Sequence, residues 1–175
     1  MRRILIIGSP GSGKSTLAKE LARRTGLALV HLDQIYWLPD WVEPVKAEWI
    51  NKLDAALAGE TWIMDGNYNS TLERRLRAAD TAVLLDLPRR VCMWRVLRRI
   101  VFSFGRTRPD MATDCPERID MKFLLYVWGF RRRQWPVDLD RLRHFSGRVY
   151  ILRSAQEIDE FLCGLTDVPA SVSKA

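Results

Sequence analysis

The chain has 175 residues, of which 47% are hydrophobic, and this composition suits one compact domain with its own core. No apolar run approaches the roughly 20 residues that span a bilayer, so we expect no signal peptide, no anchor and no membrane partner. The three cysteines are widely spaced and form no CxxC pair. They predict a reduced, cytoplasmic protein without structural zinc.

The formal net charge is +7, and it comes from the second half of the chain. Residues 1–88 carry 11 Lys or Arg against 11 Asp or Glu, whereas residues 89–175 carry 17 against 10. A basic surface suits nucleic acid, but a site for polyphosphate substrates needs the same cations. Charge therefore leaves both classes of partner open.

The first half of the chain predicts alternating strands and helices. Residues 2–7 carry a branched apolar run without alternation, which is typical of a strand buried on both faces. Apolar residues at helical spacing predict a helix over residues 14–25, which Gly26 ends. Residues 27–32 predict a second strand, and a further helix is expected to begin at Pro44.

The middle of the chain continues this alternation. Two short apolar runs, residues 61–65 and 81–86, each end in an aspartate and predict strands. A basic amphipathic helix is predicted over residues 89–104. A polar loop over residues 105–116 and another helix over 116–133 follow.

The C-terminal part predicts a last strand over residues 148–152 and a last helix. Ser154 and Glu157 form a capping box at the start of that helix. Residues 166–175 lack periodicity and are expected to be a loose tail. Strands that alternate with helices through right-handed crossovers predict one α/β domain, residues 1–165, with a parallel sheet between two layers of helices.

The segment GSPGSGKS, between the first predicted strand and helix, matches the pattern GxxxxGK[ST] of phosphate-binding P-loops. Its glycines let backbone N–H groups turn towards phosphate oxygens, and the helix N-terminus adds partial positive charge. Lys14 is expected to reach the β- and γ-phosphates of ATP, and the Ser15 hydroxyl to bind Mg²⁺. The predicted nucleotide-binding residues are Gly8, Ser9, Pro10, Gly11, Ser12, Gly13, Lys14, Ser15, Thr16, Arg95 and Arg99.

P-loops also serve GTPases and transport ATPases. Residues 51–54 read NKLD and match the guanine-recognition motif NKxD of GTPases. They fall inside the helix that is predicted to begin at Pro44, where they would not meet a base bound at the P-loop. No LSGGQ-like signature of transport ATPases occurs, so the pattern favours a kinase.

The sequence GSPGSGKST closely resembles the P-loop of adenylate kinase and its relatives, and WIMDG resembles their third strand. The arginine-rich helix after Pro88 resembles their helix that leads into the lid. More narrowly, HLDQIYW, WIMDGNY, ADTAVLLDLP and GRTRPDMATDCPER resemble the bacterial DNA topology modulation proteins, an adenylate kinase-related group. The resemblance spans about residues 3–162. It implies a three-layer P-loop fold like that of the nucleoside monophosphate kinases, with a five-stranded parallel sheet of order 2-3-1-4-5 and ATP as donor.

One position departs from the adenylate kinase pattern. Adenylate kinases follow Asp-Gly with Phe-Pro-Arg, whose arginine holds the acceptor phosphate, whereas Asn67-Tyr68-Asn69 follows here. The nearest arginines are Arg74 and Arg75. The resemblance therefore does not imply AMP as the acceptor.

Three aspartates end predicted strands at the edge of the sheet where the P-loop lies. Either Asp65 or Asp86 suits the carboxylate that meets Mg²⁺, and the resemblance favours Asp65, with Asp86 as a cap of the turn before Pro88. Asp33 ends the second strand and faces the crevice that holds acceptors in small-molecule kinases such as shikimate kinase. It is expected to orient or deprotonate an acceptor hydroxyl, with a helix N-cap as an equal alternative.

The segment of residues 89–108 contains seven arginines and no acidic residue. Arg95 and Arg99 share one helix face and suit a clamp on the transferring phosphates, with a solvated basic face as the alternative. Arg106 and Arg108 lie in the following polar loop. Since this loop lacks apolar anchors, it is expected to act as a short, mobile lid over residues 105–116.

Other features are assigned to structure rather than to chemistry. His31 and His144 are isolated in the sequence and predict structural histidines. The Trp-rich stretch of residues 37–49 is expected to pack in the core, with stacking on a base as the alternative. The arginines at 131–133 are expected to be surface charge.

Two functions from different classes follow from these features. The favoured one is a phosphotransferase that moves the γ-phosphoryl of ATP to a nucleotide, nucleoside or other small acceptor. The alternative is an ATP-dependent, DNA-associated protein whose basic second half binds DNA, although no helix-turn-helix or zinc-finger pattern occurs. In the favoured function the catalytic residues are Lys14, Asp33, Arg95 and Arg99, and the Mg²⁺ ligands are Ser15 and Asp65.

Overall fold

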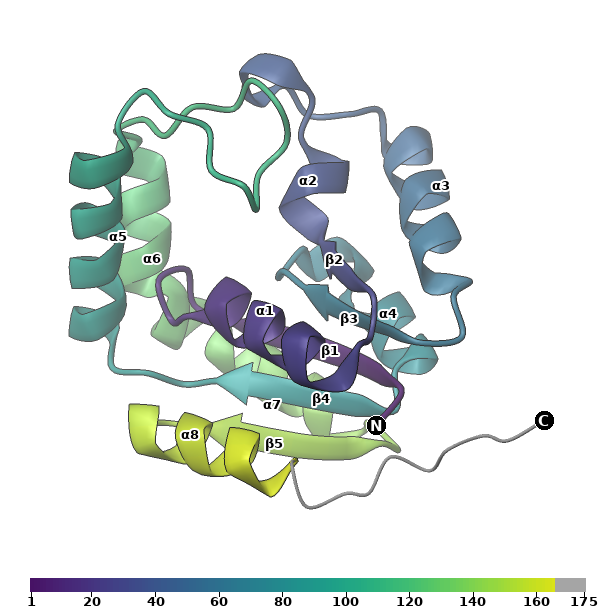
Figure 1. Cartoon of the computed structure of the whole chain (residues 1–175). Coiled ribbons are helices and arrows are strands. Elements are labelled where there is room, and N and C mark those ends of the chain that lie inside the picture. Colours follow the sequence, from purple (N-terminus) through teal and green to yellow (C-terminus); the bar gives the residue numbers. More distant parts are fainter. Residues whose placement is uncertain (166–175) are drawn as a thin grey trace.

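Strand β1 (Arg3–Gly8) is the central strand of a five-stranded sheet of order β2-β3-β1-β4-β5 (Figure 1). Each pair of neighbouring strands is parallel. The computed structural model describes residues 1–165. The other strands are β2 (Leu29–His31), β3 (Trp62–Asp65), β4 (Thr81–Leu85) and β5 (Arg148–Leu152). The α/β fold and the strand order that the resemblance implies are confirmed.

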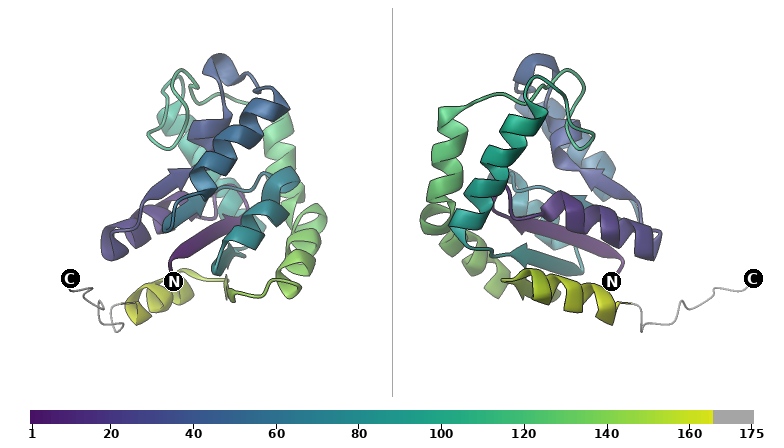
Figure 2. Two further views of the ribbon diagram at one scale, coloured as in Figure 1. Left: turned by 90° about the vertical axis from the view of Figure 1, so that its right-hand side faces the viewer. Right: turned by 60° about the vertical axis from the view of Figure 1, so that its left-hand side comes forward.

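Helices cover both faces of this sheet, as the turned views of Figure 2 show. Because side chains alternate across a strand, Ile4 and Ile6 of β1 pack in one apolar cluster, whereas Leu5 and Ile7 pack in the other. The first cluster includes residues of α1 (Lys14–Thr25), α5 (Arg89–Ser103), α6 (Met121–Arg133) and α8 (Ala155–Gly164). The second includes residues of α3 (Lys46–Leu57), α4 (Leu72–Ala78) and α7 (Trp135–Arg143). Because the strands are apolar on both faces, helices cover the sheet on both sides, and the fold has three layers.

Several boundaries differ from the prediction. The second strand is three residues long, because the chain turns at Leu32 into α2 (Leu32–Tyr36). The sequence does not predict α2, α4 or α7, since short helices offer too few turns for a clear period. Two 3-10 turns, η1 (Pro39–Trp41) and η2 (Asn69–Thr71), also lie in the segments after β2 and β3.

Helix α6 begins later than predicted. Its N-cap is Asp120, whose carboxylate accepts hydrogen bonds from the amides of Lys122 and Phe123. Before this cap the chain is extended and forms isolated bridges to the segment that leaves α5, Phe104 with Glu117 and Thr107 with Pro116. Residues 116–120 therefore belong to the loop and not to the helix.

Helix ends elsewhere follow the sequence signals. Gly26 ends α1 in a left-handed conformation with φ of 71°. The Ser154 side chain accepts a hydrogen bond from the Glu157 amide at the start of α8, as the capping box predicts. The NKLD segment, residues 51–54, lies inside α3, as predicted. The predicted tail over residues 166–175 lies outside the described residues.

The loop between α5 and α6 crosses towards α2 and η1, over the carboxyl edge of the sheet (Figure 1). The expectation that this loop lacks apolar anchors is wrong. Met111, Ala112 and Cys115 are buried in a small apolar cluster against Trp37 and Trp41. The tryptophans of the stretch 37–49 therefore pack, in part, against a segment that lies some 70 positions later in the chain.

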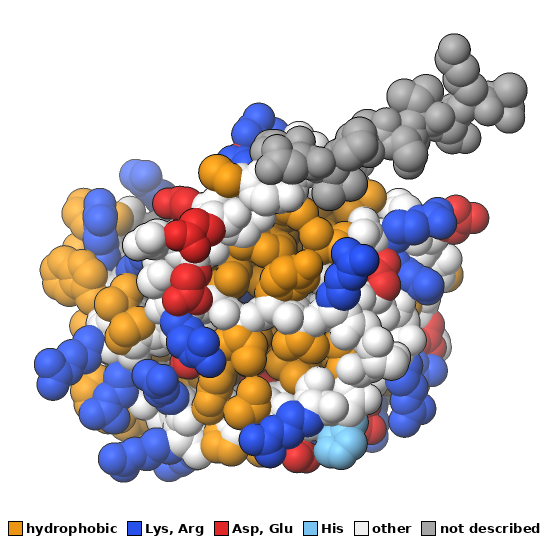
Figure 3. Space-filling model, turned by 90° about the horizontal axis from the view of Figure 1, so that it is seen from below, with side chains coloured by type: hydrophobic (Ala, Val, Ile, Leu, Met, Phe, Trp, Pro, Cys, Tyr) orange, Lys and Arg blue, Asp and Glu red, His pale blue; other side chains and the backbone are white. Residues whose placement is uncertain are grey.

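The side of the molecule that carries strand β5 and the character of the helices both bear on possible partners. Strand β5 is an edge strand in which only Leu152 is fully buried. Seen from below, this side of the molecule shows apolar side chains in its middle, with Lys and Arg around them (Figure 3). Across residues 1–165, none of the helices has the length and apolar character that a bilayer crossing requires.

Two glycines of the P-loop have no room for a side chain. A Cβ atom on Gly8 would lie 2.6 Å from the Leu85 carbonyl oxygen, and one on Gly11 would lie 2.3 Å from the Cys92 carbonyl oxygen. Both glycines also have positive φ. The P-loop is therefore packed directly against the end of β4 and the first turn of α5.

Replacing a glycine by alanine has two costs here, the strain of a left-handed φ and the clash of the new Cβ atom, and two variants separate them. Gly26→Ala meets no atom within 4 Å, so we expect only the cost of a left-handed φ, about 1–2 kcal/mol. Gly11→Ala adds a clash with backbone and should cost about 1–3 kcal/mol more. Urea denaturation of both variants measures the difference. Equal losses of unfolding free energy would contradict the packing of the P-loop against α5.

Candidate functional site

The P-loop joins β1 to α1 and is clamped from the side by Asn67. The Gly8 amide donates to Asn67 Oδ1 at 3.1 Å, and Asn67 Nδ2 donates to the Gly8 carbonyl at 2.8 Å. Within the loop, the Ser12 amide donates to the Ser9 carbonyl at 3.1 Å. The segment after β3 therefore fixes the entry of the phosphate loop, a role that the sequence does not predict for Asn67.

Lys14 lies inside the curve of the P-loop. Its ammonium donates to the carbonyl oxygens of Gly8 and Ser9 at 2.9 and 3.0 Å. Burial lowers the pKa of Lys14, and the carboxylates of Asp65 and Asp33 oppose this shift. The structure thus brings together three residues that the sequence selects from separate segments.

Asp65 is held by a histidine from the neighbouring strand. His31 lies opposite Asp65 in the β2–β3 register, and its Nδ1 is 3.0 Å from Asp65 Oδ2. Both side chains are buried, and Asp65 Oδ1 is a buried oxygen without a hydrogen-bond partner among the described residues. His31 is therefore a neighbour of the predicted metal ligand and not merely a structural histidine, whereas His144 is exposed and bonds the Asp140 carbonyl.

The oxygen atoms near Lys14 fit a hydrated magnesium ion. Mg²⁺ prefers oxygen ligands, keeps several waters and is usually bound through one or two carboxylates together with substrate phosphates. The unpartnered Asp65 oxygen and the Ser15 hydroxyl supply such groups. Within residues 1–165, no three His, Cys, Asp or Glu side chains gather into a metal-binding group of their own.

Asp86, the other candidate for the metal, has arginines as its partners. Arg131 Nη2 donates to Asp86 Oδ2 at 3.3 Å, and Arg153 Nε is 3.9 Å from the same oxygen. Burial raises the pKa of Asp86, and the two arginines act against that rise. The carboxylates that act on Lys14 are those of Asp65 and Asp33. The geometry therefore favours Asp65 for the metal.

Asp33 faces an unexpected partner, Tyr68. The Tyr68 hydroxyl donates to Asp33 Oδ1 at 2.6 Å. Burial raises the pKa of Asp33; the Tyr68 hydrogen bond acts to lower it, and Asp65 acts to raise it. The N-cap of α2 is His31, and Asp33 lies inside the first turn of that helix. The interpretation of Asp33 as an N-cap is therefore wrong, and its carboxylate remains directed at the site.

Aromatic rings stand beside this carboxylate. The Tyr68 ring lies 4.5 Å from that of Tyr36 and 5.2 Å from that of Trp49, between ring centroids. Trp49 is buried in the core, as expected for the Trp-rich stretch. Tyr68 itself adopts a positive φ of 34°, which is uncommon for a residue with a side chain. The site thus has a preformed apolar wall next to a raised-pKa acid.

The arginines nearest to Asn67 do not face this site. Arg75 is fully buried and donates to the carbonyl oxygens of Gly66, Asn67 and Tyr68. Burial lowers its pKa to about 9. Arg74 pairs with Asp54 on the surface, at 2.8 Å. Arg75 therefore shapes the loop after β3, and neither arginine replaces the acceptor-phosphate arginine of adenylate kinases.

Of the predicted clamp arginines, Arg99 has an acidic partner among the described residues and Arg95 does not, and the lid arginine Arg108 has two such partners. Arg99 pairs with Glu117 at 2.9 Å, and Arg108 pairs with both Asp110 and Glu117 at 2.8 and 3.0 Å. Arg95 Nη1 donates to the Ser12 carbonyl of the P-loop at 3.3 Å. The alternative of a solvated basic face does not hold for Arg99, because its guanidinium pairs with Glu117, 18 positions away in the loop.

The loop also brings a carboxylate to the P-loop serine. Asp110 is buried, and besides Arg108 the Ser15 hydroxyl is a hydrogen-bond partner of its carboxylate. Burial acts to raise the pKa of Asp110, but Arg108 together with hydrogen bonds and Lys19 acts against it, so that this pKa lies below its ordinary value. Arg106, by contrast, is exposed. Of the two predicted lid arginines, only Arg108 forms ion pairs with Asp110 and Glu117.

Sequence reasoning missed several residues of this site. Asn67 and Tyr68 follow directly on a strand end, and this position at the carboxyl edge is a signal that could have found them. His31 required the register of β2 against β3. The partners Asp110 and Glu117 lie in a loop whose path depends on tertiary packing, so no local pattern indicates them.

Comparison with known proteins agrees with this geometry. A family model described as an AAA domain matches residues 4–101, which include the P-loop, Asp33, Asp65 and most of α5. The chain belongs to this AAA-domain family. A comparison of this AAA-domain chain with curated proteins finds no match.

Solved structures share the fold of this AAA-domain chain. Shikimate kinase from Acinetobacter baumannii in complex with shikimate is similar with a TM-score of 0.61 at 12% identity, over 95% of this chain and 91% of that chain. Shikimate kinase from Bacteroides thetaiotaomicron gives a TM-score of 0.57 at 16% identity, over 95% and 96%. At such identities the similarity establishes the fold alone.

Adjacent arginines allow a matched test of the loop after β3. Arg75→Met leaves three carbonyl oxygens and the nearby Asp138 without this buried cation, so the unfolding free energy should fall by about 3–5 kcal/mol. Arg74→Met removes an exposed ion pair and should cost at most about 1 kcal/mol. Chemical denaturation of both variants measures this. Similar small losses would show that Arg75 does not hold the loop.

Proposed function

We propose that the protein is a kinase that transfers the γ-phosphoryl group of ATP to a hydroxyl group of a small molecule. The observation that carries the proposal is the convergence of Lys14 with two carboxylates of different environment. Asp65 is held by His31, and Asp33 has a raised pKa beside Tyr68. Such a transfer requires a cation that binds the phosphates, a carboxylate that holds the metal ion and a base for the acceptor hydroxyl.

The donor side of the site fits Mg²⁺-ATP. The glycine backbone of the P-loop and the N-terminus of α1 are suited to the phosphates, with Lys14 and Arg95 as cations beside them. Ser15 and Asp65 would hold the magnesium ion, which neutralises charge on the phosphates when bound. Lys14 now bonds two carbonyl oxygens of the loop, and phosphate oxygens would replace these partners.

On the acceptor side, Asp33 is proposed as the general base. Its carboxylate takes the proton of the acceptor hydroxyl while the acceptor oxygen forms a bond to the γ-phosphorus and the bond to the ADP oxygen breaks. Tyr68 holds one oxygen of Asp33, which leaves the other for the acceptor. A raised pKa makes this carboxylate a better proton acceptor than an ordinary aspartate.

The acceptor is proposed to present a hydroxyl rather than a phosphate group. Arg74 is engaged on the surface and Arg75 inside the loop, so the place of the acceptor-phosphate arginine is empty of cations from this segment. The aromatic rings of Tyr36 and Tyr68 suit the apolar face of a small ring or chain. The fold similarity to shikimate kinases is consistent with a small acceptor.

The loop over residues 104–120 is proposed to act as a lid. Glu117 is buried between Arg99 and Arg108. Arg99 acts on Lys14 of the P-loop, and Arg108 acts on Asp33. Transferring phosphates would compete with Glu117 and Asp110 for these guanidinium groups, so that the lid contacts change during turnover. Anchors on Trp37 and Trp41 keep the loop over the site.

The narrower resemblance to DNA topology modulation proteins stays a prediction, as does the DNA-associated function. Part of the basic charge of the second half is already engaged in internal ion pairs, with Glu117, Asp110 and Asp86. This favours the kinase over the DNA-associated protein.

The direct experiment is an acceptor screen. ADP release from Mg²⁺-ATP is measured with hydroxyl-bearing metabolites and with nucleoside monophosphates, using Lys14→Met as the inactive control. We expect one hydroxyl compound to raise the rate far above the background, and only in the wild-type protein. Stimulation by a nucleoside monophosphate alone would contradict the proposed acceptor class.

Replacing the base gives a sharper signature. Asp33→Asn keeps the size and the Tyr68 hydrogen bond but should lower kcat by about 10²–10⁴-fold. Since the base must be ionised and burial raises its pKa, wild-type kcat/KM should rise with pH through a value above the ordinary aspartate pKa of about 3.9. A pH–rate profile of both proteins, with the acceptor from the screen, checks this. A variant that keeps the same acidic limb would exclude Asp33 as its origin.

The lid arginines offer another matched pair. Arg108→Ala should lower kcat more than it weakens nucleotide binding, because its phosphate contacts form mainly in the transition state. Arg106→Ala, two positions away and exposed, should leave both nearly unchanged. Steady-state kinetics and equilibrium nucleotide binding are measured for each. Equal effects of the two substitutions would argue that the lid acts only through its net charge.

A further inference from the structure

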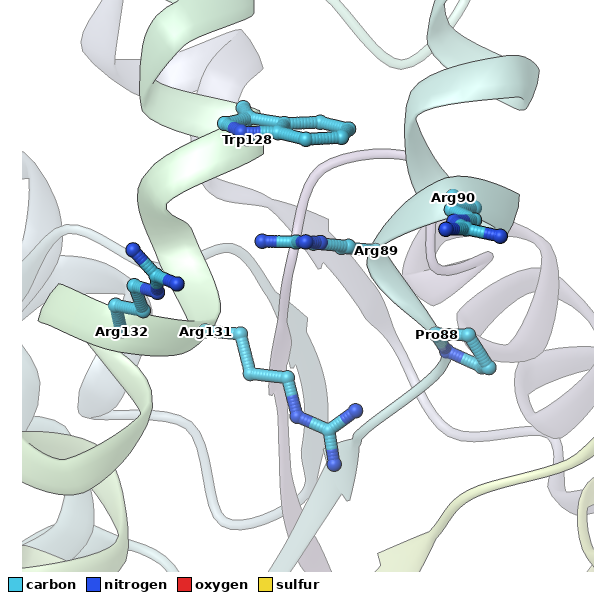
Figure 4. Close-up of a pocket in the computed structure, with 6 residues that line it drawn as sticks. All are labelled: Pro88, Arg89, Arg90, Trp128, Arg131 and Arg132. Carbon is cyan, nitrogen blue, oxygen red and sulfur yellow. The ribbon is translucent and has the colours of Figure 1, made fainter.

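A second cationic site lies apart from the phosphate-facing side of the P-loop, where the start of α5 approaches the end of α6 (Figure 4). It is a cleft of about 360 Å³, which lies within the range of small-molecule sites. Its walls carry four arginines, a proline and a tryptophan. The lining residues are Pro88, Arg89, Arg90, Trp128, Arg131 and Arg132.

The positive charge of this cleft is largely uncompensated. Arg131 donates to Asp86, a carboxylate that Arg153 also approaches at 3.9 Å. Arg90 and Arg132 are exposed and form no ion pair within residues 1–165. Arg89 stacks on Trp128 with its guanidinium carbon 4.4 Å from the ring centroid. Of the four guanidinium groups of the cleft, only that of Arg131 is paired with a carboxylate among the described residues.

The position of two of these arginines is unfavourable unless an anion is present. Arg89 and Arg90 occupy the first turn of α5, a helix of 15 residues without an acidic residue in that turn or a side-chain cap at Pro88. The helix dipole places partial positive charge at this end, which disfavours cations and favours anions. An anion in the cleft would interact favourably with both guanidinium groups and with the helix dipole.

The chemistry of the cleft suits phosphate groups in particular. Guanidinium forks match phosphate oxygens in a bidentate geometry. Stacking on the Trp128 ring holds the Arg89 group in place before a ligand arrives, and Figure 4 shows the two planes facing each other. Several arginines in one cleft favour a ligand with more than one phosphate over a single carboxylate.

The cleft adjoins the back of the P-loop. A narrower neighbouring cavity is lined by Ser9 of the P-loop together with Asp86, Arg89 and Arg131. The first turn of α5 also contacts Gly11 through the Cys92 carbonyl. A ligand that draws α5 towards the cleft would therefore act on the P-loop backbone.

We propose that this cleft is a second anion site, which binds a free small molecule carrying two or more phosphate groups and thereby modulates the P-loop. The site shares no cation with the Lys14, Arg95 and Arg108 group. It does not rest on the proposed kinase function, because binding is measured without acceptor or turnover.

The probe is inorganic tripolyphosphate, titrated calorimetrically at about 0.15 M salt. The titrated protein is the full chain with Lys14→Met, which weakens phosphate binding at the P-loop but leaves the cleft intact. We expect one binding event. Adding Arg90→Gln and Arg132→Gln should lower its affinity about tenfold or more. Adding Arg133→Gln instead, the next residue of α6 and not part of the cleft lining, should change it by less than about twofold.

The possible outcomes separate the proposal from its alternatives. The substituted side chains are exposed, and circular dichroism confirms that each variant is folded. No tripolyphosphate binding, or equal losses for the cleft variant and the Arg133 control, would overturn the proposal. Binding to vesicles of anionic phospholipid but not to tripolyphosphate would also overturn it, since the face would then be a membrane surface and not a site for a free ligand.

Discussion

The P-loop backbone must remain open towards phosphate, and the rest of the structure depends on this constraint. Gly8 and Gly11 meet it because neither has room for a Cβ atom against the carbonyls of Leu85 and Cys92. The Asn67 side chain completes it with two hydrogen bonds to Gly8. Through these contacts the end of β4, the start of α5 and the segment after β3 all take their positions from one loop. The acceptor side and the helix that leads to the lid are thereby placed relative to the same point.

The cations of the site are bonded to oxygen atoms of the protein, which phosphate oxygens could replace. Lys14 bonds carbonyls of its own loop, and Glu117 lies buried between Arg99 and Arg108. Buried ion pairs are costly to form and costly to leave half broken, so each cation needs a partner in every state. Carboxylates and carbonyls can fill this role before phosphates do. Asp33 differs, because its burial is offset chiefly by one tyrosine hydroxyl and its pKa is raised.

The parts of this site that the sequence predicts are those encoded by contiguous residues. The P-loop pattern, the buried strands and the aspartate that ends β3 all depend on neighbours in the chain, whereas the strand order rests on family resemblance. The sequence does not predict the role of His31, because its contact with Asp65 joins two different strands. It does not predict that of Glu117 either, because Glu117 pairs with Arg99 across a loop. The anchors of that loop were missed for a similar reason, since Met111 packs in a cluster that includes tryptophans from another segment. Long-range packing of irregular chain has no periodic signal.

The measurement that tests the central claim most directly is the fate of the γ-phosphoryl group. Phosphorus NMR can follow Mg²⁺-ATP with the wild-type protein and a pool of small hydroxyl compounds. The account predicts that ADP and a new phosphate ester resonance appear in equal amounts, because the lid and Asp33 direct the phosphoryl group to an acceptor hydroxyl. Formation of ADP with inorganic phosphate alone, at a rate independent of the pool, would contradict it and identify the protein as an ATPase.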